Sequence, residues 1–453
     1  MKKTLALLLT IVLLMMAGCG SSKEYLTGAV SDTGVVAIGI PGEPMNTDPA
    51  LYDGSLAARA MMGLLYEGLT AVNEEGIAVG AAAEHWEVTT TDDAAKRPVY
   101  TFTLRQGACW SDGSEVKAED FIGAWKRVIS GAVESPYRYL FDVILGAKDY
   151  ENEESELGLA VTEEGALQVT LEGDFAGFAH MLAAPAFYPV KEGERVYNGR
   201  YAMTAIGDHV ATLSPNGGYR GEKTGTGLTL KYYFGDMAAL EEWAADGTLQ
   251  ATFGYAGENA PAVTGSNGVN GYYVLNTERL PDAAQRQQAM KLLIGGAAEG
   301  SEPKAMTLLT TAGASADGDT EPAKAAGLTV DARSYEEYKA ARAAGEYDIL
   351  YLAVSYDYPD AAVLLSWFGS GSTGNYAKYN NEEFDDMLSK INAETDEAAR
   401  ADLVNGAEKV LEDDGVLLQA GSGQTVLYCN AVLSGITCDA QGMWDFANAR
   451  YAT

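Results

Sequence analysis

One stretch limits the fold more than any other: residues 347–360 read Tyr-Asp-Ile-Leu-Tyr-Leu-Ala-Val-Ser-Tyr-Asp-Tyr-Pro-Asp. The apolar run from Ile349 to Val354 has the length of a buried β-strand. Pro359 ends regular structure and favours an extended conformation at the residue before it. Asp357 therefore stands between two tyrosines at the end of a buried strand, which is where ligands bind in open α/β sheets. The stretch predicts an α/β fold with a ligand site, and a solvated turn aspartate is the alternative.

Composition excludes several functions. The chain has 453 residues, enough for two to three domains, and 64 acidic against 31 basic residues give a net charge of -33. Such a chain repels nucleic acid and anionic lipid head groups. The three histidines, His85, His180 and His209, lie far apart, so no local metal site is visible. No nucleophile elbow, zinc-protease or P-loop motif occurs, and we expect neither an enzyme nor a cofactor.

The N-terminus predicts export. Two lysines precede 13 mostly apolar residues, Leu5 to Ala17, a run that is short for a membrane span and typical of a signal peptide covering residues 1–18. The sequence Ala17-Gly18-Cys19 resembles a bacterial lipoprotein cleavage box. That resemblance implies an acylated Cys19 that anchors the chain to the membrane, with residues 19–34 as a tether. Ordinary secretion with a free cysteine is the alternative.

Residues 100–127 carry the densest pattern. Residues 100–105 alternate apolar and polar side chains as a half-buried strand does, and residues 110–113, Trp-Ser-Asp-Gly, predict a turn. Glu119 and Asp120 then occupy the first turn of a predicted helix, where carboxylates complement the helix dipole.

This segment resembles the peptide-binding solute receptors of ABC importers, the peptide/nickel-binding class. The resemblance continues in order over about residues 35 to 425, on these short motifs: Glu43-Pro44 with Asp48-Pro49, Tyr66-Glu-Gly-Leu-Thr70, Ala83-Glu-His-Trp86, Ser135-Pro-Tyr137, Asn198-Gly-Arg-Tyr201, Leu275-Asn-Thr277, Asp357-Tyr-Pro-Asp360 and Tyr379-Asn-Asn381.

The resemblance implies a two-lobed periplasmic-binding-protein-like α/β fold with a hinge. The first lobe would use residues 35–50, 165–262 and 426–453, with residues 51–164 as its extra subdomain. Residues 263–425 would form the second lobe, which is shortened because the stretch before Tyr335 is brief. We place one crossing between the lobes in the glycine-rich residues 254–271.

The resemblance also implies a receptor that binds peptides between its lobes and delivers them to ABC transporter permease subunits. Asp357 would pair with the peptide α-ammonium, and Ser355 and Tyr356, with Glu43 and Pro44 opposite, would supply backbone hydrogen bonds. Cleft aromatics would be drawn from the residues Tyr137, Tyr356, Tyr358 and Trp367, for which core packing is the alternative. The protein would be a lipid-anchored monomer on the outer face of the cell membrane.

Two other functions stay open: binding of a non-peptide solute, such as a sugar or a metal chelate, and a degenerate surface lipoprotein that acts as scaffold or sensor. Cys429 and Cys438 are candidates for a disulfide across a predicted strand-turn-strand at residues 424–437. Helices are expected at residues 56–69, 282–293, 335–344, 384–391 and 397–411, strands at 35–40 and 82–88, and an apolar turn at 305–309.

Overall fold

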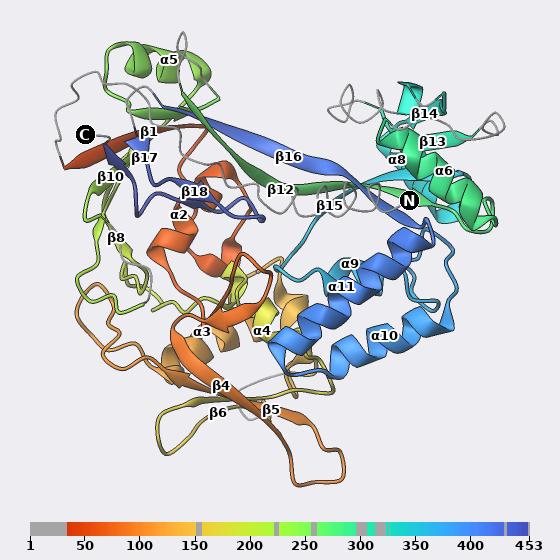
Figure 1. The fold of residues 1–453 in the computed structure, drawn as a ribbon. Coiled ribbons are helices and arrows are strands. Elements are labelled where there is room, and N and C mark those ends of the chain that lie inside the picture. Colours follow the sequence, from red (N-terminus) through yellow and green to blue (C-terminus); the bar gives the residue numbers. More distant parts are fainter. Residues whose placement is uncertain are drawn as a thin grey trace, which may run out of the picture.

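The computed structural model describes residues 34–150, 156–221, 226–254, 261–295, 306–312, 323–325, 327–429 and 433–451. The predicted signal peptide, Cys19 and residues 20–33 of the tether lie outside this part. Two long strands, β12 (Ala262–Leu275) and β16 (Leu417–Cys429), connect two groups of helices and strands (Figure 1). In the part of the chain that the structure describes, no helix is long and apolar enough to cross a membrane.

Among the described residues, one mixed sheet of ten strands runs through both groups in the order β14-β13-β15-β12-β16-β11-β1-β10-β9-β8. Its other strands are β1 (Val35–Pro41), β8 (Tyr201–Ile206), β9 (Val210–Pro215), β10 (Thr229–Gly235), β11 (Ala251–Phe253), β13 (Thr307–Thr311), β14 (Thr329–Arg333) and β15 (Ile349–Ser355). The predicted strand at residues 35–40 is confirmed as β1, which pairs in parallel with β10 and β11 at the centre of the first half of the sheet.

A second sheet of four strands, in the order β4-β5-β7-β6, lies apart from the first (Figure 1). Its strands are β4 (Ala83–Thr90), β5 (Pro98–Leu104), β6 (Leu159–Val161) and β7 (Leu167–Thr170). The predicted alternation in β5 is confirmed, since Tyr100 and Phe102 are buried and the threonines between and after them are partly exposed. Short pairs complete the strands: β2 (Thr70–Val72) with β3 (Ala78–Gly80), β17 (Leu433–Ser434) with β20 (Arg450–Tyr451), and β18 (Thr437–Cys438) with β19 (Trp444–Asp445).

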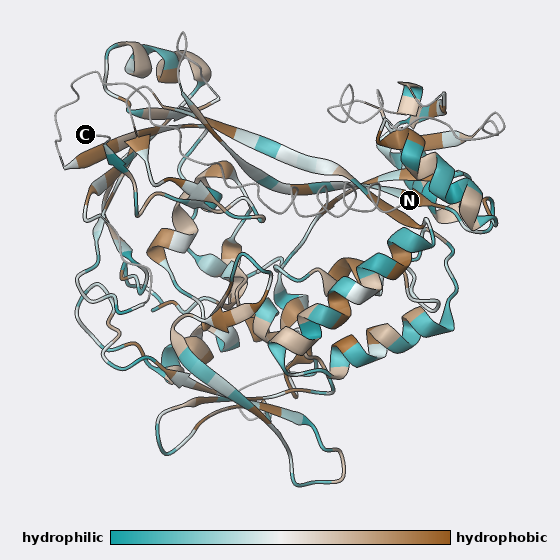
Figure 2. Cartoon of the chain, viewed as in Figure 1, coloured by the Kyte–Doolittle hydropathy of each residue, from teal (hydrophilic) through white to brown (hydrophobic). Residues whose placement is uncertain are grey.

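The helices pack against the sheets and against one another. They are α2 (Leu56–Leu65), α3 (Ala118–Ile129), α4 (Phe178–Met181), α5 (Met237–Ala245), α6 (Ala283–Leu293), α8 (Tyr335–Ala344), α9 (Ala362–Ser366), α10 (Glu382–Ala393) and α11 (Glu397–Asp413), with 3₁₀ turns at Pro49–Leu51, Arg138–Val143 and Pro185–Phe187. In α10 and α11, hydrophilic and hydrophobic residues alternate along the ribbon as expected for half-buried helices (Figure 2).

The hydrophobic cores divide the chain into two lobes. One large core takes its buried residues from Val36 to Phe253 and from Leu427 to Ala449. Two further cores take theirs from Tyr273 to Val416. We call the parts built around them the first lobe and the second lobe. Boundaries at residues 262 and 425 stay a prediction, because β12, which begins at Ala262, and β16, which continues through residue 425, both extend from one lobe into the other.

The strands that link the lobes are irregular midway. β12 and β16 pair antiparallel from Ala262 opposite Tyr428 to Val274 opposite Leu417, with a register shift between Ser266 and Asn270. Gly268 lies in this interval with φ +77°, and a Cβ there would be 2.5 Å from the carbonyl oxygen of Gln441. Only glycine tolerates both the positive φ and the close carbonyl oxygen. The pairing of β12 with β16 is therefore interrupted, between the lobes, at a position that requires glycine.

Several sequence predictions need correction. The helix predicted to reach residue 69 ends at Leu65, and Tyr66 already has an extended backbone. The predicted apolar turn at 305–309 is instead part of strand β13, which pairs between β14 and β15 in the sheet. By contrast, the glycine-rich segment 254–271 was predicted only to hold a crossing between the lobes, and much of its described part is the first part of β12, which pairs with β16 and, from Val269 onward, also with β15.

Strands β16 and β17 are present in the predicted strand-turn-strand at residues 424–437, but they do not pair with each other, and Cys429 and Cys438 are not joined by a disulfide. β16 pairs with β11 and β12, while β17 pairs with β20. Cys429 lies opposite Ala251 and has a free thiol. Cys438 packs over Gly265, which pairs with Thr425, four residues along β16 from Cys429. At about 3.3 Å per residue this separation exceeds the reach of a disulfide.

Candidate functional site

The candidate site is built on the residues that follow β15. β15 pairs with β12 as far as Ser355 opposite Val269, and the chain then leaves the sheet. Pro359 lacks an N–H and cannot continue a strand. Asp360 accepts a hydrogen bond at 2.9 Å from the backbone N–H of Ala362, where α9 begins. The predicted change from buried strand to polar, aromatic loop is therefore confirmed.

Asp357 is exposed in this loop and reaches across to the first lobe. Its carboxylate accepts a hydrogen bond from the hydroxyl of Tyr139, which belongs to the 3₁₀ turn Arg138–Val143. Partial burial, together with this hydrogen bond, raises the pKa of Tyr139 above its ordinary value. Tyr139 is itself 51% exposed. The partner of Asp357 is thus a neutral phenol, and in the described part of the chain the carboxylate forms no ion pair.

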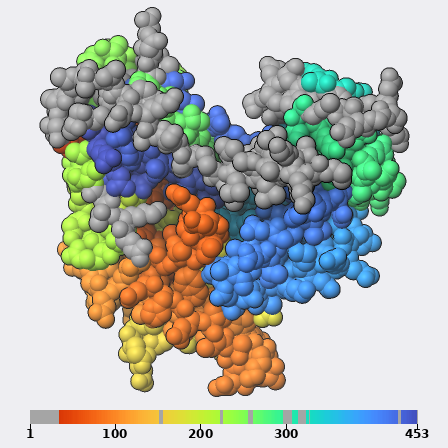
Figure 3. All heavy atoms as spheres, in the orientation of Figure 1, coloured from red at the N-terminus to blue at the C-terminus, as the bar shows by residue number. Residues whose placement is uncertain are grey.

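A cavity of about 630 Å³ contains five of the predicted residues on its wall: Tyr137, Ser355, Tyr356, Asp357 and Tyr358. Its other lining residues include residues of α2, residues 267–269 of β12, most of the C-terminal segment 437–445, and first-lobe residues before and after α2, in β2 and β3, and at 183–188 and 199–200. The cavity thus lies between the two lobes at the irregular part of β12. In the space-filling view the orange residues of the first lobe and the blue residues of the second lie directly against each other (Figure 3).

Three predicted residues are not brought to this cavity. Glu43 and Pro44 follow β1, and neither belongs to the cavity wall. Trp367 directly follows α9 and packs against the core of the second lobe, which removes it from the cavity. A ligand contact by these three residues is not supported by this arrangement.

The two tyrosines beside Asp357 have structural partners. The hydroxyl of Tyr356 is 2.7 Å from that of Tyr272, and burial raises the pKa of Tyr356. Tyr358 packs edge-on against Phe175 of the first lobe, with ring centroids 6.5 Å apart. Both tyrosines therefore fix the loop around Asp357 as well as lining the cavity.

Charges in the cavity favour a cationic group. The cavity wall carries five carboxylates and three guanidinium groups. The carboxylates belong to Asp53, Glu67, Asp357, Asp439 and Asp445, and the guanidinium groups to Arg59, Arg105 and Arg200. Arg200 pairs with Asp445 at 2.8 Å. Since carboxylates are in excess, an ammonium group entering the cavity meets a favourable potential.

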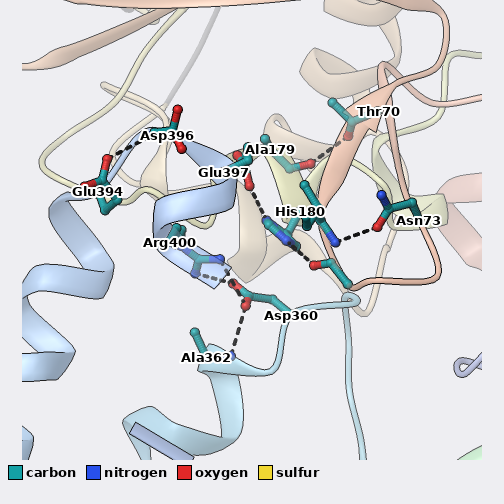
Figure 4. Close-up of polar contacts among 12 residues, drawn as sticks. Thr70, Asn73, Ala179, His180, Asp360, Ala362, Glu394, Asp396, Glu397 and Arg400 are labelled. Carbon is teal, nitrogen blue, oxygen red and sulfur yellow. Dashed lines mark hydrogen bonds and ion pairs between the residues drawn. The ribbon is translucent and has the colours of Figure 1, made fainter. Parts of the chain in front are cut away.

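A second cluster, which sequence reasoning missed, joins the lobes beside this loop (Figure 4). Asp360 and Arg400 form an ion pair at 2.7 Å, with side chains 4% and 3% exposed. His180 of α4 and Glu397 of α11 point toward one another from opposite lobes, with Nδ1 and Oε2 3.5 Å apart. The available sequence signals were a single histidine, His180, in an apolar segment and an arginine, Arg400, on the inner face of a helix. Neither signal indicates which residue is the partner.

The structure also bears on metal binding. Within the described residues, no group of three or more histidine, cysteine, aspartate or glutamate side chains could hold a metal ion.

Comparison with known proteins identifies a family whose model matches residues 78–294: the bacterial extracellular solute-binding proteins, family 5. The chain is 24% identical over 468 residues to the periplasmic murein peptide-binding protein MppA of Escherichia coli, covering 82% of this chain and 84% of that protein. It is 33% identical over 183 residues to the probable deoxycholate-binding periplasmic protein YgiS of Escherichia coli, covering 36% of this chain and 32% of that one.

Among solved structures, the unliganded open form of MppA superposes with a TM-score of 0.75 at 20% identity, covering 89% of this chain and 94% of that chain. The likeness establishes a two-lobed solute-binding fold, as the sequence predicted.

Proposed function

We propose that this chain, a member of family 5 of the bacterial extracellular solute-binding proteins, binds a peptide between its lobes with the peptide α-ammonium on Asp357. Proteins of this family are binding and transport components rather than enzymes. They act outside the cytoplasm. The ligand would therefore leave chemically unchanged.

The observation that carries the proposal is that the Asp357 carboxylate has no cationic partner among the described residues. This carboxylate lies on the wall of an acidic cavity, and its hydrogen-bond partner is the neutral Tyr139 rather than a cation. An α-ammonium is a compact cation with three donors, so it can take the place of the phenol and neutralise the carboxylate. Closing the lobes around such a pair would strengthen it, because water is then excluded.

The edge of β15 supports backbone recognition. β13 pairs with β15 at residues Ile349 and Leu350, and no described strand pairs with that edge farther along, toward Ser355. A peptide strand can add its backbone hydrogen bonds to such an edge without reading side chains. Ser355, Tyr356, Tyr358 and Tyr137 would then contact the ligand from the wall of the cavity.

The relatives support a wider role. MppA is named for murein peptide binding, and it aligns with most of this chain. We include in the proposal delivery of the peptide to an ABC transporter permease, a lipid anchor at Cys19, a monomeric state and the lobe boundaries at residues 262 and 425. Binding in the cleft would favour closed lobes, because only closed lobes contact the ligand from both sides.

A second candidate is a non-peptide solute. It is favoured by the similarity of 183 residues to a protein named as probably deoxycholate-binding. A bile acid carries no ammonium group, so this candidate would not use Asp357 as a cation anchor.

Thermal unfolding of residues 20–453 with pools of di- to octapeptides, free and N-acetylated, tests the proposal. A ligand of the native state raises the midpoint by mass action. We expect free peptides to raise it and acetylated peptides to raise it much less. A rise with deoxycholate and none with any peptide would favour the second candidate. No rise with either would leave a scaffold or sensor as the better description.

A further inference from the structure

The contact between His180 and Glu397 contains an unusual pairing of polar atoms. His180 is 3% exposed, and its Nε2 lies 3.0 Å from the carbonyl oxygen of Gly76. Since a carbonyl can only accept, Nε2 must carry a hydrogen. In the neutral ring Nδ1 is then a bare acceptor, and it faces the second lobe.

Glu397 supplies the other side of the contact. Its Oε2 lies 3.5 Å from Nδ1 of His180, and its carboxyl group also accepts a hydrogen bond from the backbone N–H of Ala78. Nδ1 and Oε2 are both buried and have no other hydrogen-bond partner among the described residues. Two facing acceptors repel one another unless a proton lies between them, and burial removes the water that could separate them.

We propose that His180 and Glu397 share one proton wherever the lobes meet at this junction, and that losing the proton loosens the junction and makes lobe separation depend on pH. The junction includes further contacts between the lobes. The backbone N–H of Ala176 donates to the carbonyl of Asn392 at 2.9 Å, and Tyr358 packs on Phe175.

The surroundings place the proton on the carboxyl group. Burial raises the pKa of Glu397 to about 7, against the lowering effect of Arg400. Burial also lowers the pKa of His180. Both directions favour a neutral imidazole that accepts a hydrogen bond from a protonated Glu397.

The remaining charged and titratable groups at this junction come from three elements. Asp360 follows β15, and its charge raises the pKa of both Glu397 and His180. Asp396, the residue before α11, raises that of Glu397 further. Tyr100 of β5 also faces Glu397, and burial raises its pKa so that it stays neutral. The buried ion pair with Arg400 compensates Asp360.

The sign of the effect follows from counting protons. Separated lobes expose both side chains to water, where glutamate ionises above about pH 4.3 and histidine loses its proton above about pH 6.5. Between these pH values the separated pair also holds one proton, so the equilibrium between joined and separated lobes depends little on pH. Above about pH 6.5 the joined pair holds one more proton than the separated pair, until it too loses the proton near pH 7. That window spans about half a pH unit, so the difference of one proton favours separation by up to about threefold in all.

The first test is nuclear magnetic resonance of the ligand-free chain, residues 20–453, labelled with ¹⁵N in its histidines. His180 is buried, whereas His85 and His209 are exposed and serve as internal references. We expect His180 to remain the neutral Nε2–H tautomer, with an Nδ1 that accepts a hydrogen bond, down to a lower pH than the references. An Nδ1–H tautomer, or protonation together with the exposed histidines, would overturn the proposal.

The second test is small-angle X-ray scattering of the same chain from pH 5.5 to 8.5. In Glu397→Gln the amide N–H can donate to Nδ1 without a titrating proton, so we expect the radius of gyration to rise above about pH 6.5 in the wild type and to stay constant in the variant. Glu394→Gln is the matched control, since Glu394 accepts from the backbone N–H of Asp396 two residues away, and it should behave as the wild type. Equal pH responses in all three chains would contradict the proposal. Neither test uses a peptide, so their outcome is separate from that of the proposed function.

Discussion

Arg400 and Asp360 form a buried ion pair three residues beyond Asp357: Nη2 of the guanidinium lies 2.7 Å from Oδ2 of the carboxylate. Asp360 also accepts from the backbone N–H of Ala362. The loop that carries Asp357 is therefore fixed to α11 at one end and to β15 at the other. A flexible loop would have to be ordered on binding, whereas this one is held in place beforehand.

Replacing one partner of the pair should be costly. Arg400→Met leaves the Asp360 carboxylate buried without its cation, and we expect a loss of about 3–5 kcal/mol in the free energy of unfolding. Urea unfolding measures it. Arg97→Met is the matched control, because Arg97 pairs with Asp93 at the surface, and surface pairs contribute little. Equal losses in the two variants would contradict the role of the buried pair.

A methyl group can disturb the same junction from the first lobe. A Cβ on Gly177 would lie 2.7 Å from Oδ2 of Asp360 and 3.2 Å from Nη2 of Arg400. We expect Gly177→Ala to destabilise the protein by about 1–3 kcal/mol through overpacking. Gly123→Ala serves as the control, since Gly123 lies inside α3 with no atom within 4 Å of its added Cβ. This control should be stabilising by up to about 1 kcal/mol, and a loss as large as that of Gly177→Ala would refute the steric explanation.

Tyr139 should compete with the ligand. Its hydroxyl occupies Asp357 in this structure, so a peptide ammonium must displace it. We expect Tyr139→Phe to bind free peptides more tightly by up to about tenfold, the equivalent of one hydrogen bond. Calorimetric titration measures the affinity, with Tyr335→Phe as control, because Tyr335 is an exposed residue of α8. Weaker binding would mean that the hydroxyl stays in the complex.

The thiols should differ in reactivity. Burial raises the pKa of Cys429 to about 11, and the thiolate is the reactive form. At pH 8 we expect iodoacetamide to modify the half-buried Cys109 first and Cys429 only after unfolding. Mass spectrometry of the alkylated chain distinguishes them. A chain lighter by the two hydrogens of a Cys429–Cys438 disulfide would contradict the strand pairing described here.

The sequence predicted the elements whose signal is local. β15 is an uninterrupted apolar run, and α8 (Tyr335–Ala344) begins and ends at the predicted residues because Ser334 and Glu337 form a capping box and Gly345 adopts φ +70° at its end. The change from apolar strand to polar loop at Tyr356 was local too. Each of these features is set by residues within one or two turns of chain.

What the sequence could not provide depends on distant partners. β13 is a strand because β14 and β15 flank it, and Tyr139 reaches Asp357 across 218 positions of sequence. The glycine-rich residues 254–271 carry no local strand signal, yet Gly265 and Gly271 of β12 pair with β16. His180 and Glu397 meet only because α4 and α11 pack together, so no local pattern identifies their contact.

The anchor at Asp357 is tested most directly by calorimetric titration of one short peptide and its N-acetylated form, each against the wild type and Asp357→Asn. Acetylation should cost the wild type on the order of 2–5 kcal/mol in binding free energy, the range for losing one partner of a charge pair that is buried when the lobes close. The same acetylation should cost Asp357→Asn little, because its anchor charge is already gone. Asp53→Asn, which removes another carboxylate of the cavity wall, should respond as the wild type does. Equal binding of both peptides by the wild type, or an unchanged cost of acetylation in Asp357→Asn, would contradict the account.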